Sequence, residues 1–234
     1  MKVTLFIPTL NEYEGMKAIM PRVKEGWVDE IIVMDGGSTD GTLEYAKEKD
    51  YKIFVQKKKG LRHAYIEGFP HISGDIVITF SPDGNSIPEL IPPLIEKMKD
   101  GYDMTIVSRY ADGAKSEDDG ILTGFGNWFF TKSINLFHGG KYTDAMVMFR
   151  AYRTSLFYDL DLHKEESYYV PEKLFFTVLG IEPLLSTRAA KRGIKTAEIP
   201  GDEPPRIGGS RKLQVVRWGG AYYLQVLREK FCWK

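Results

Sequence analysis

The chain has 234 residues, of which 43% are hydrophobic and 27% charged, a composition typical of a globular protein. Its 32 Lys and Arg residues balance 32 Asp and Glu residues, so the formal net charge is zero. The overall charge therefore does not suggest that the protein binds nucleic acid. The single cysteine, Cys232, excludes an internal disulfide framework and a cysteine-rich zinc site.

The first 110 residues alternate between strand-like and helix-like segments. β-forming runs occur at residues 2–7, 28–34, 51–55, 75–80 and 102–108, and helical patterns fill the intervals. The nearly continuous apolar runs indicate strands that are covered on both faces. This alternation predicts an α/β fold, with a Rossmann-like, mostly parallel central sheet and helices on both faces.

The second half of the chain is less regular. We expect, in order, a polar loop at 111–120, a helix at 121–137, a strand at 142–149, a helix broken near Gly180 and Pro183 at 172–192, a strand at 195–200, a loop at 201–210 and a helix at 213–233. The start of the chain carries no signal-peptide pattern, and no apolar run reaches transmembrane length. We therefore expect a cytoplasmic protein whose membrane contact, if any, is peripheral and at the inner face.

A strand that ends in an acidic turn is the first candidate site. The run ending at Phe80 is followed by Ser81-Pro82-Asp83-Gly84-Asn85, at the strand end where open α/β sheets carry their chemistry. Asp83 and Asn85 offer two oxygen ligands to a hard cation, which substrate phosphates would also help to hold. The same residue types are common in ordinary turns, and this alternative stays open.

Two further strands end in polar turns. Residues 8–12 (PTLNE) follow the first strand and residues 35–37 (DGG) follow the second. In a parallel sheet these ends lie on the same edge as Asp83, where Asp35 or Glu12 would accept hydrogen bonds from a base or ribose. Each turn alone is most often just a helix cap or an ordinary turn, so their convergence is what indicates a binding site.

Basic residues follow the third and fifth strands. Residues 57–63 (KKKGLRH) open a helix, and Arg62 is our candidate there for a phosphate contact. The alternative is a solvated basic run. Arg109 follows the strand at 102–108 and reaches the same edge of the sheet.

Together these motifs resemble a known family. The first half of the chain resembles the family 2 glycosyltransferases of GT-A fold, in the segments IPTLNE, VMDGGSTDGT and KKGLRHAYIEGF and in the Asp83 turn. The rest of the chain is similar to polyprenyl-phosphate sugar transferases of the dolichyl-phosphate mannose synthase type, in the segments VSRY, TDAMVMFRAYR, GIEPLLSTRAAKRGIKTAEIP and PRIGGSRKL. The resemblance covers nearly the whole chain and implies one domain, 1–234, with a nucleotide-sugar-binding half at 1–110 and an acceptor-binding half at 111–234 that ends in a helix.

The resemblance also implies roles for single residues. Asp83 and Asn85 would hold Mg²⁺ or Mn²⁺ against the donor pyrophosphate, and Arg109 would reach the sugar-phosphate. The nucleotide pocket would be lined by Pro8, Thr9, Asn11 and Glu12, with Asp35 on the base. The acceptor side and the loop that closes over it would use Arg150, Arg206, Ser210, Arg211 and Lys212.

One position departs from the family pattern, which usually has two aspartates spaced Asp-x-Asp at this strand end. Ser81 stands at the first of these positions, and only Asp83 matches the second. The loss of one carboxylate puts the metal affinity or the mode of coordination in question.

The resemblance implies inverting transfer from a UDP- or GDP-sugar, and the acceptor decides whether a base is needed. A polyprenyl phosphate, with a second pKa of about 6, is already an anion at neutral pH and needs no base. A saccharide hydroxyl needs a carboxylate, for which Glu182 is the candidate. A nucleotide-sugar-binding protein without transfer activity is the remaining interpretation.

The C-terminal segment has two interpretations. From Arg206 onward it carries seven basic residues against one acid, Glu229, with aromatic residues interleaved. Such a segment favours peripheral contact with an anionic membrane surface. Alternatively, its aromatic residues dock a terminal helix on the core.

Overall fold

The computed structural model describes residues 1–207 and 215–233, apart from the side chains of residues 215 and 216. The described residues form a seven-stranded sheet in the order β3-β2-β1-β4-β6-β5-β7. All neighbouring strands pair in parallel except β6, which runs antiparallel to β4 and β5. The strands are β1 (Val3–Thr9), β2 (Glu30–Asp35), β3 (Lys52–Val55), β4 (Ile76–Thr79), β5 (Met104–Ser108), β6 (Arg150–Arg153) and β7 (Thr196–Pro200).

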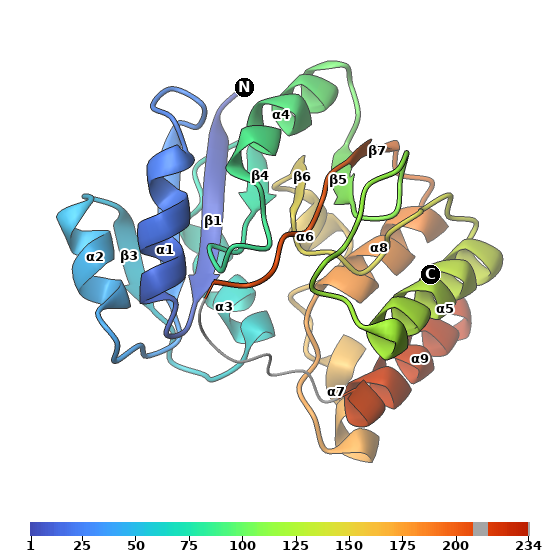
Figure 1. Cartoon of the computed structure of the whole chain (residues 1–234). Helices are drawn as coiled ribbons and strands as arrows, with labels where there is room; N and C mark the ends of the chain where they lie inside the picture. The colour runs from blue at the N-terminus through green and yellow to red at the C-terminus, as the bar shows by residue number, and fades with distance from the viewer. Residues whose placement is uncertain (208–214, 234) are drawn as a thin grey trace.

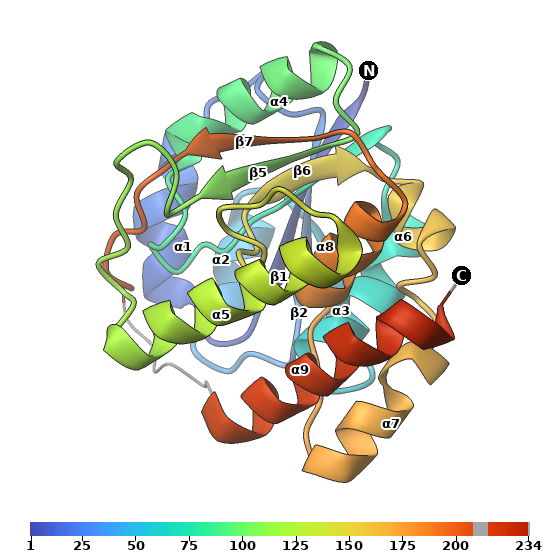
Figure 2. The ribbon, with the colours of Figure 1, turned by 90° about the vertical axis from the view of Figure 1, so that its right-hand side faces the viewer.

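Helices cover both faces of this sheet (Figure 1). They are α1 (Tyr13–Ile19), α2 (Thr42–Glu48), α3 (Leu61–Gly68), α4 (Ile91–Lys99), α5 (Ile121–His138), α6 (Leu156–Asp159), α7 (Glu166–Phe175), α8 (Glu182–Lys191) and α9 (Val215–Cys232). Figure 2 shows α4 on one side of β5, β6 and β7, with α5, α8 and α9 on the other. The α/β architecture expected from the alternating segments is confirmed.

The two faces of the sheet bury separate hydrophobic clusters. Leu5 and Ile7 of β1 pack with α1, α2 and α4, whereas Phe6 between them packs with α3 and, through the same cluster, α5 and α8. Successive side chains of a strand point to opposite faces, so burial on both faces explains why β1 reads as a continuous apolar run.

The strand expected at residues 142–149 is wrong. This segment is irregular, and the strand begins at Arg150, antiparallel to its neighbours. Side chains form hydrogen bonds with the backbone N–H and C=O groups that would otherwise pair with a neighbouring strand. The Asn135 amide bonds both the N–H and the C=O of Tyr142, and Glu198 accepts from the N–H of Thr143.

The helix expected at 172–192 is interrupted, as its Gly180 and Pro183 indicated. Helix α7 ends at Phe175, Phe176 adopts a φ of 51°, and α8 begins at Glu182. Pro183 lies in the first turn of α8, where its missing N–H removes no helical hydrogen bond.

Helix α9 packs against α5, α7 and α8. Ala221, Gln225 and Val226 are buried, and Glu229 forms a buried ion pair with Arg188 of α8 at 2.7 Å. The docking interpretation of this segment therefore holds for its described residues. In the described residues, no helix combines the length and apolar character that a membrane-spanning helix needs.

Candidate active site

The turn after β2 is organised around Asp35. Its carboxylate is fully buried, and it accepts hydrogen bonds from the N–H groups of Gly37 and Ser38, both at 2.8 Å. Its other oxygen accepts from the hydroxyls of Ser38 and Thr9, the latter at 3.2 Å. Asp35 thus fixes the shape of the turn beside the end of β1.

Asn11 joins the same turn to the loop after β1. It adopts a φ of 57°, its Oδ1 accepts from the N–H of Thr39 at 2.9 Å, and its N–H donates to Ser38 Oγ at 2.9 Å. Pro8 and Thr9 line a cavity of about 540 Å³, which we call the β1–β2 cavity. Its other walls are Leu10, Gly36, Gln56, Gly60, Leu61, Ala64, the 176–180 segment, Trp218 and Tyr222.

Asp83 lies at the centre of the turn after β4 and is buried. Its Oδ2 lies 2.8 Å from Arg206 Nη2, and its Oδ1 accepts from the N–H of Asn85 at 3.1 Å. The Asp83 carbonyl accepts from the N–H of Ile207 at 2.6 Å, so the segment around Arg206 lies across the turn. Arg206 also approaches Glu12, with 3.6 Å between Nη1 and Oε1.

Gly84 is required for the close approach of the Arg206 segment to the turn after β4. Its φ of 99° lies in the left-handed region, and a Cβ at this position would come within 2.8 Å of the Ile207 side chain. A substitution at Gly84 would therefore push the Arg206 segment away from Asp83.

The residues around Asp83 fit a divalent cation. Asn85 Oδ1 is buried and finds no partner among the described residues, and it lines a cavity of about 210 Å³ together with Ser81 and Asp83. A carboxylate and an amide oxygen are hard ligands of the kind that Mg²⁺ and Mn²⁺ take. Within residues 1–207 and 215–233, no group of three or more His, Cys, Asp or Glu side chains is placed to hold a metal ion.

Arg109, at the end of β5, is surrounded by three carboxylates. Its Nε lies 2.6 Å from Asp144, and its Nη1 lies 3.1 Å from Glu203 and 3.4 Å from Asp119. Burial alone would lower the pKa of this guanidinium, but the three carboxylates raise it above its ordinary value. Arg109 lines both the cavity at Asp83 and a second one beneath α5, so it lies between them.

Sequence reasoning missed Asp119, Asp144 and Glu203. They come from three separate segments, and their pairing with Arg109 depends on the fold. The one available signal was the TDAMVMFRAYR motif, which contains Asp144.

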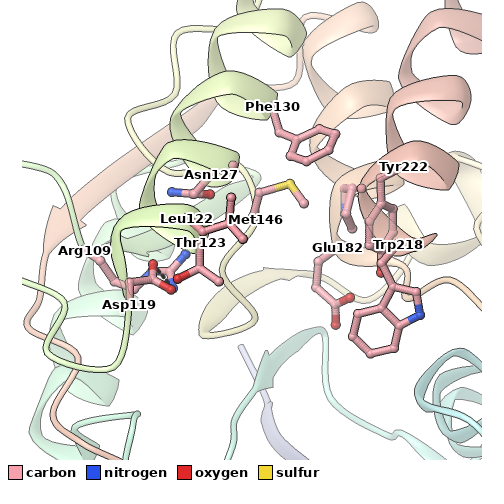
Figure 3. Close-up of a pocket in the computed structure, with 13 residues that line it drawn as sticks. Arg109, Asp119, Leu122, Thr123, Asn127, Phe130, Met146, Glu182, Trp218 and Tyr222 are labelled. Atoms are coloured by element: carbon pink, nitrogen blue, oxygen red, sulfur yellow. Dashed lines mark hydrogen bonds and ion pairs between the residues drawn. The ribbon is translucent and has the colours of Figure 1, made fainter. Parts of the chain in front are cut away.

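The second cavity has a volume of about 240 Å³, and we call it the α5–α9 cavity (Figure 3). Glu182 lines it, is almost fully buried, and accepts a hydrogen bond from Tyr65 Oη at 2.8 Å. Burial raises the pKa of the Glu182 carboxyl, because the charged form loses its hydration. The remaining walls are Arg109, Asp119, Leu122, Thr123, Gly126, Asn127, Phe130, Met146, Pro183, Trp218, Gly219 and Tyr222.

Two arginines lie elsewhere than the sequence suggested. Arg62 is buried between Glu165, 2.8 Å away, and Glu172, and its guanidinium stacks on Tyr168, so it braces α3 against α7 rather than facing a phosphate. Arg150 is fully buried, which excludes the acceptor contact expected of it in this conformation. Its donors bind the Val147 carbonyl and Ser186 Oγ. Ser210, Arg211 and Lys212 lie outside the described residues.

Comparisons with known proteins identify the family of the chain. Residues 4–161 match the family described as Glycosyl transferase family 2. Over 223 residues the chain is 41% identical to a dolichol-phosphate mannosyltransferase of Pyrococcus furiosus, covering 92% of this chain and 60% of that protein. It is 27% identical to an undecaprenyl-phosphate mannosyltransferase of Micrococcus luteus, covering 98% of this chain and 99% of that protein.

A solved structure shares the fold. Glucosyl-3-phosphoglycerate synthase from Mycobacterium tuberculosis, in complex with Mg²⁺ and UDP, superposes with a TM-score of 0.69 at 19% identity. The match covers 98% of this chain and 79% of that one. The sheet and helices described above are therefore the GT-A arrangement.

Proposed function

This chain belongs to glycosyl transferase family 2, and we propose that it transfers a sugar from a nucleotide sugar to a polyprenyl phosphate, with inversion and with a divalent cation. The observation that carries the proposal is the position of Asp83 and Asn85 at the edge of the sheet that also carries the β1–β2 cavity. Relatives named as dolichol-phosphate and undecaprenyl-phosphate mannosyltransferases support this acceptor class.

The β1–β2 cavity would bind the base and ribose. Pro8 and Thr9 form one wall and the 176–180 segment another, and the Asp35 turn holds Gly36 in place between them. Gln56 adds an amide to a largely apolar lining, the combination that orients a planar base. The solved relative in complex with UDP supports a nucleoside diphosphate here.

The leaving pyrophosphate would lie at Asp83. Asp83 and Asn85 would hold Mg²⁺ or Mn²⁺, which when bound stabilises the negative charge that develops on the leaving group. Arg206, now 2.8 Å from Asp83, is positioned to contact the same phosphates. The acceptor attacks the anomeric carbon from the opposite side, which inverts its configuration.

A lipid acceptor is consistent with the surface of α5. This helix exposes Ile121 (97%), Phe125, Trp128 and Leu136 (78%), and it contains no acidic residue. Apolar and aromatic side chains on a helix without acids suit the interface of an anionic bilayer. We therefore assign the peripheral membrane contact to α5, next to the α5–α9 cavity, rather than to the docked α9.

A saccharide hydroxyl is the second candidate acceptor, because Glu182 lines the α5–α9 cavity. Its raised pKa makes the ionised carboxylate a stronger base than an exposed glutamate. A phosphate acceptor would not need this base, so Glu182→Gln separates the candidates. The substitution should stop transfer to a hydroxyl and spare transfer to a phosphate.

The test is a transfer assay on the purified chain with UDP-glucose, UDP-N-acetylglucosamine and GDP-mannose, each with and without Mn²⁺. Farnesyl phosphate and a short oligosaccharide serve as acceptors, and the anomeric proton coupling of the product reports inversion or retention. Metal-dependent transfer to farnesyl phosphate is expected. Donor binding without turnover would instead indicate a nucleotide-sugar-binding protein.

A further inference from the structure

Asn127 of α5 has a buried side-chain amide. It is 7% exposed, and neither its Oδ1 nor its Nδ2 finds a hydrogen bond in the described part of the chain. Buried side-chain amides are nearly always paired in folded proteins. Asn135, two turns further along the same helix, is the contrast, since it donates to the Tyr142 carbonyl at 2.8 Å and accepts from its N–H at 3.0 Å.

The unpaired amide belongs to the wall of the α5–α9 cavity. In Figure 3, Asn127 lies with Arg109 and Asp119 on one side of the cavity, and Glu182 and Trp218 lie on the other. The polar end of the cavity is thus close to the Arg109 cluster, defined as Arg109, Asp119, Asp144 and Glu203.

The charge of the Arg109 cluster limits what Asn127 can bind. Among the described residues, one guanidinium faces three carboxylates, so these four side chains carry an excess of negative charge. A phosphate group at this end of the cavity would meet like charge. A hydroxyl would not, and the amide offers it one acceptor and two donors in a single plane.

We propose that Asn127 is a specificity residue that binds neighbouring hydroxyl groups of the transferred sugar through Oδ1 and Nδ2. This inference rests on the proposed function. Because Arg109 lines both the Asp83 cavity and the α5–α9 cavity, a sugar attached to a pyrophosphate at Asp83 extends past Arg109 toward Asn127.

The experiment compares Asn127→Leu with the parent, using the donor that the parent transfers and its singly deoxygenated analogues. In the parent, at least one deoxy donor should lose about 100-fold or more in kcat/KM, because a site built for a hydroxyl rejects the analogue that lacks it. Asn127→Leu should lose most of this discrimination and leave the acceptor KM unchanged. Its Tm should equal or exceed that of the parent, since the amide it removes has no partner among the described residues.

Asn135→Leu is the matched control. It removes an amide from the same helix whose two hydrogen bonds are made, so it should lower the Tm and leave the sugar discrimination intact. Unchanged discrimination in Asn127→Leu overturns the inference while the parent's activity upholds the proposed function. An effect confined to the acceptor KM overturns the assignment to the sugar. A parent that transfers no sugar overturns the proposed function, and with it the inference.

Discussion

Two regions of the molecule treat their buried polar groups in opposite ways. Strand β2 and its turn pair them: Glu30 accepts from Thr4, Lys52 and Ser73, and Asp35 accepts from Gly37 and Ser38 of its own turn and from Thr9 of β1. The α5–α9 cavity contains a carboxyl of raised pKa at Glu182 and, at Asn127, an amide that no described residue pairs. The polar groups of the first region fix its shape, whereas those of the second are available to the ligands that we propose.

The largest effect is expected at Asp83, which lies at the cavity between the two regions. Asp83→Ala should lower the kcat of sugar transfer about 10²–10³-fold, because it removes the carboxylate that would hold the cation at the leaving pyrophosphate. Asn85→Ala should lower this kcat less, and added Mn²⁺ should restore it. Steady-state kinetics against the Mn²⁺ concentration measure both variants. Full activity of Asp83→Ala would exclude this turn as the donor site.

Glu30 tests the paired region. Burial alone would raise its pKa, but hydrogen bonds from Lys52, Thr4 and Ser73 lower the pKa from 4.5 to about 2. A carboxyl whose pKa is lowered by folding stabilises the protein above its unfolded pKa, and this contribution disappears as the pH falls from 4.5 to about 2. Glu30→Gln should therefore cost about 3 kcal/mol at pH 7 and little at pH 2.

Urea unfolding of parent and variant across this pH range measures the difference in the free energy of unfolding. Glu89→Gln is the control, because its ion pair with Arg22 at 2.7 Å is exposed and should contribute little. A Glu30→Gln loss that does not change with pH would contradict the pairing described for β2.

Arg206 connects the Asp83 turn to the second half of the chain. Its guanidinium lies 2.8 Å from the carboxylate that would bind the cation, so the two positive charges compete for Asp83. Arg206→Ala should tighten donor-free Mn²⁺ binding about tenfold, measured by calorimetry, whereas the exposed Arg22→Ala should leave it unchanged. Weaker Mn²⁺ binding in Arg206→Ala would show that the guanidinium supports the cation instead.

The smallest effect concerns the exposed face of α5. Trp128→Ser should lower binding to vesicles containing anionic lipid about fivefold, because one interfacial indole is lost. Tyr158→Ser on α6 removes an aromatic residue of similar exposure and should have no effect. Co-sedimentation measures both, and equal binding of parent and Trp128→Ser would remove α5 as the contact surface.

The fold of residues 1–110 could be predicted well from the sequence because its signals are local. Buried strands such as β1 read as apolar runs, and the turn residues that follow them mark the functional edge. The strand prediction at residues 142–149 was wrong because the apolar side chains there are typical of a strand. In the structure, Asn135 and Glu198 accept hydrogen bonds from the backbone N–H groups of Tyr142 and Thr143.

The site was harder to predict because its ion pairs join distant segments. Arg62 stood in a basic turn, yet its partners Glu165 and Glu172 lie about a hundred residues away and draw it toward α7. Asn127 stood in an aromatic-rich helix, where nothing local distinguishes an unpaired amide from a paired one such as Asn135.

The reversed direction of β6 has a kinetic consequence. Because β6 starts where β4 and β5 end, the segment that precedes it, Tyr142–Phe149, lies at the functional edge. Within the five residues 144–148 it supplies Asp144 to Arg109, Met146 to the α5–α9 cavity and Met148 to the cavity at Asp83. Substitutions in this one segment should therefore change the kinetic constants for donor and acceptor together, so the two specificities cannot evolve independently through it.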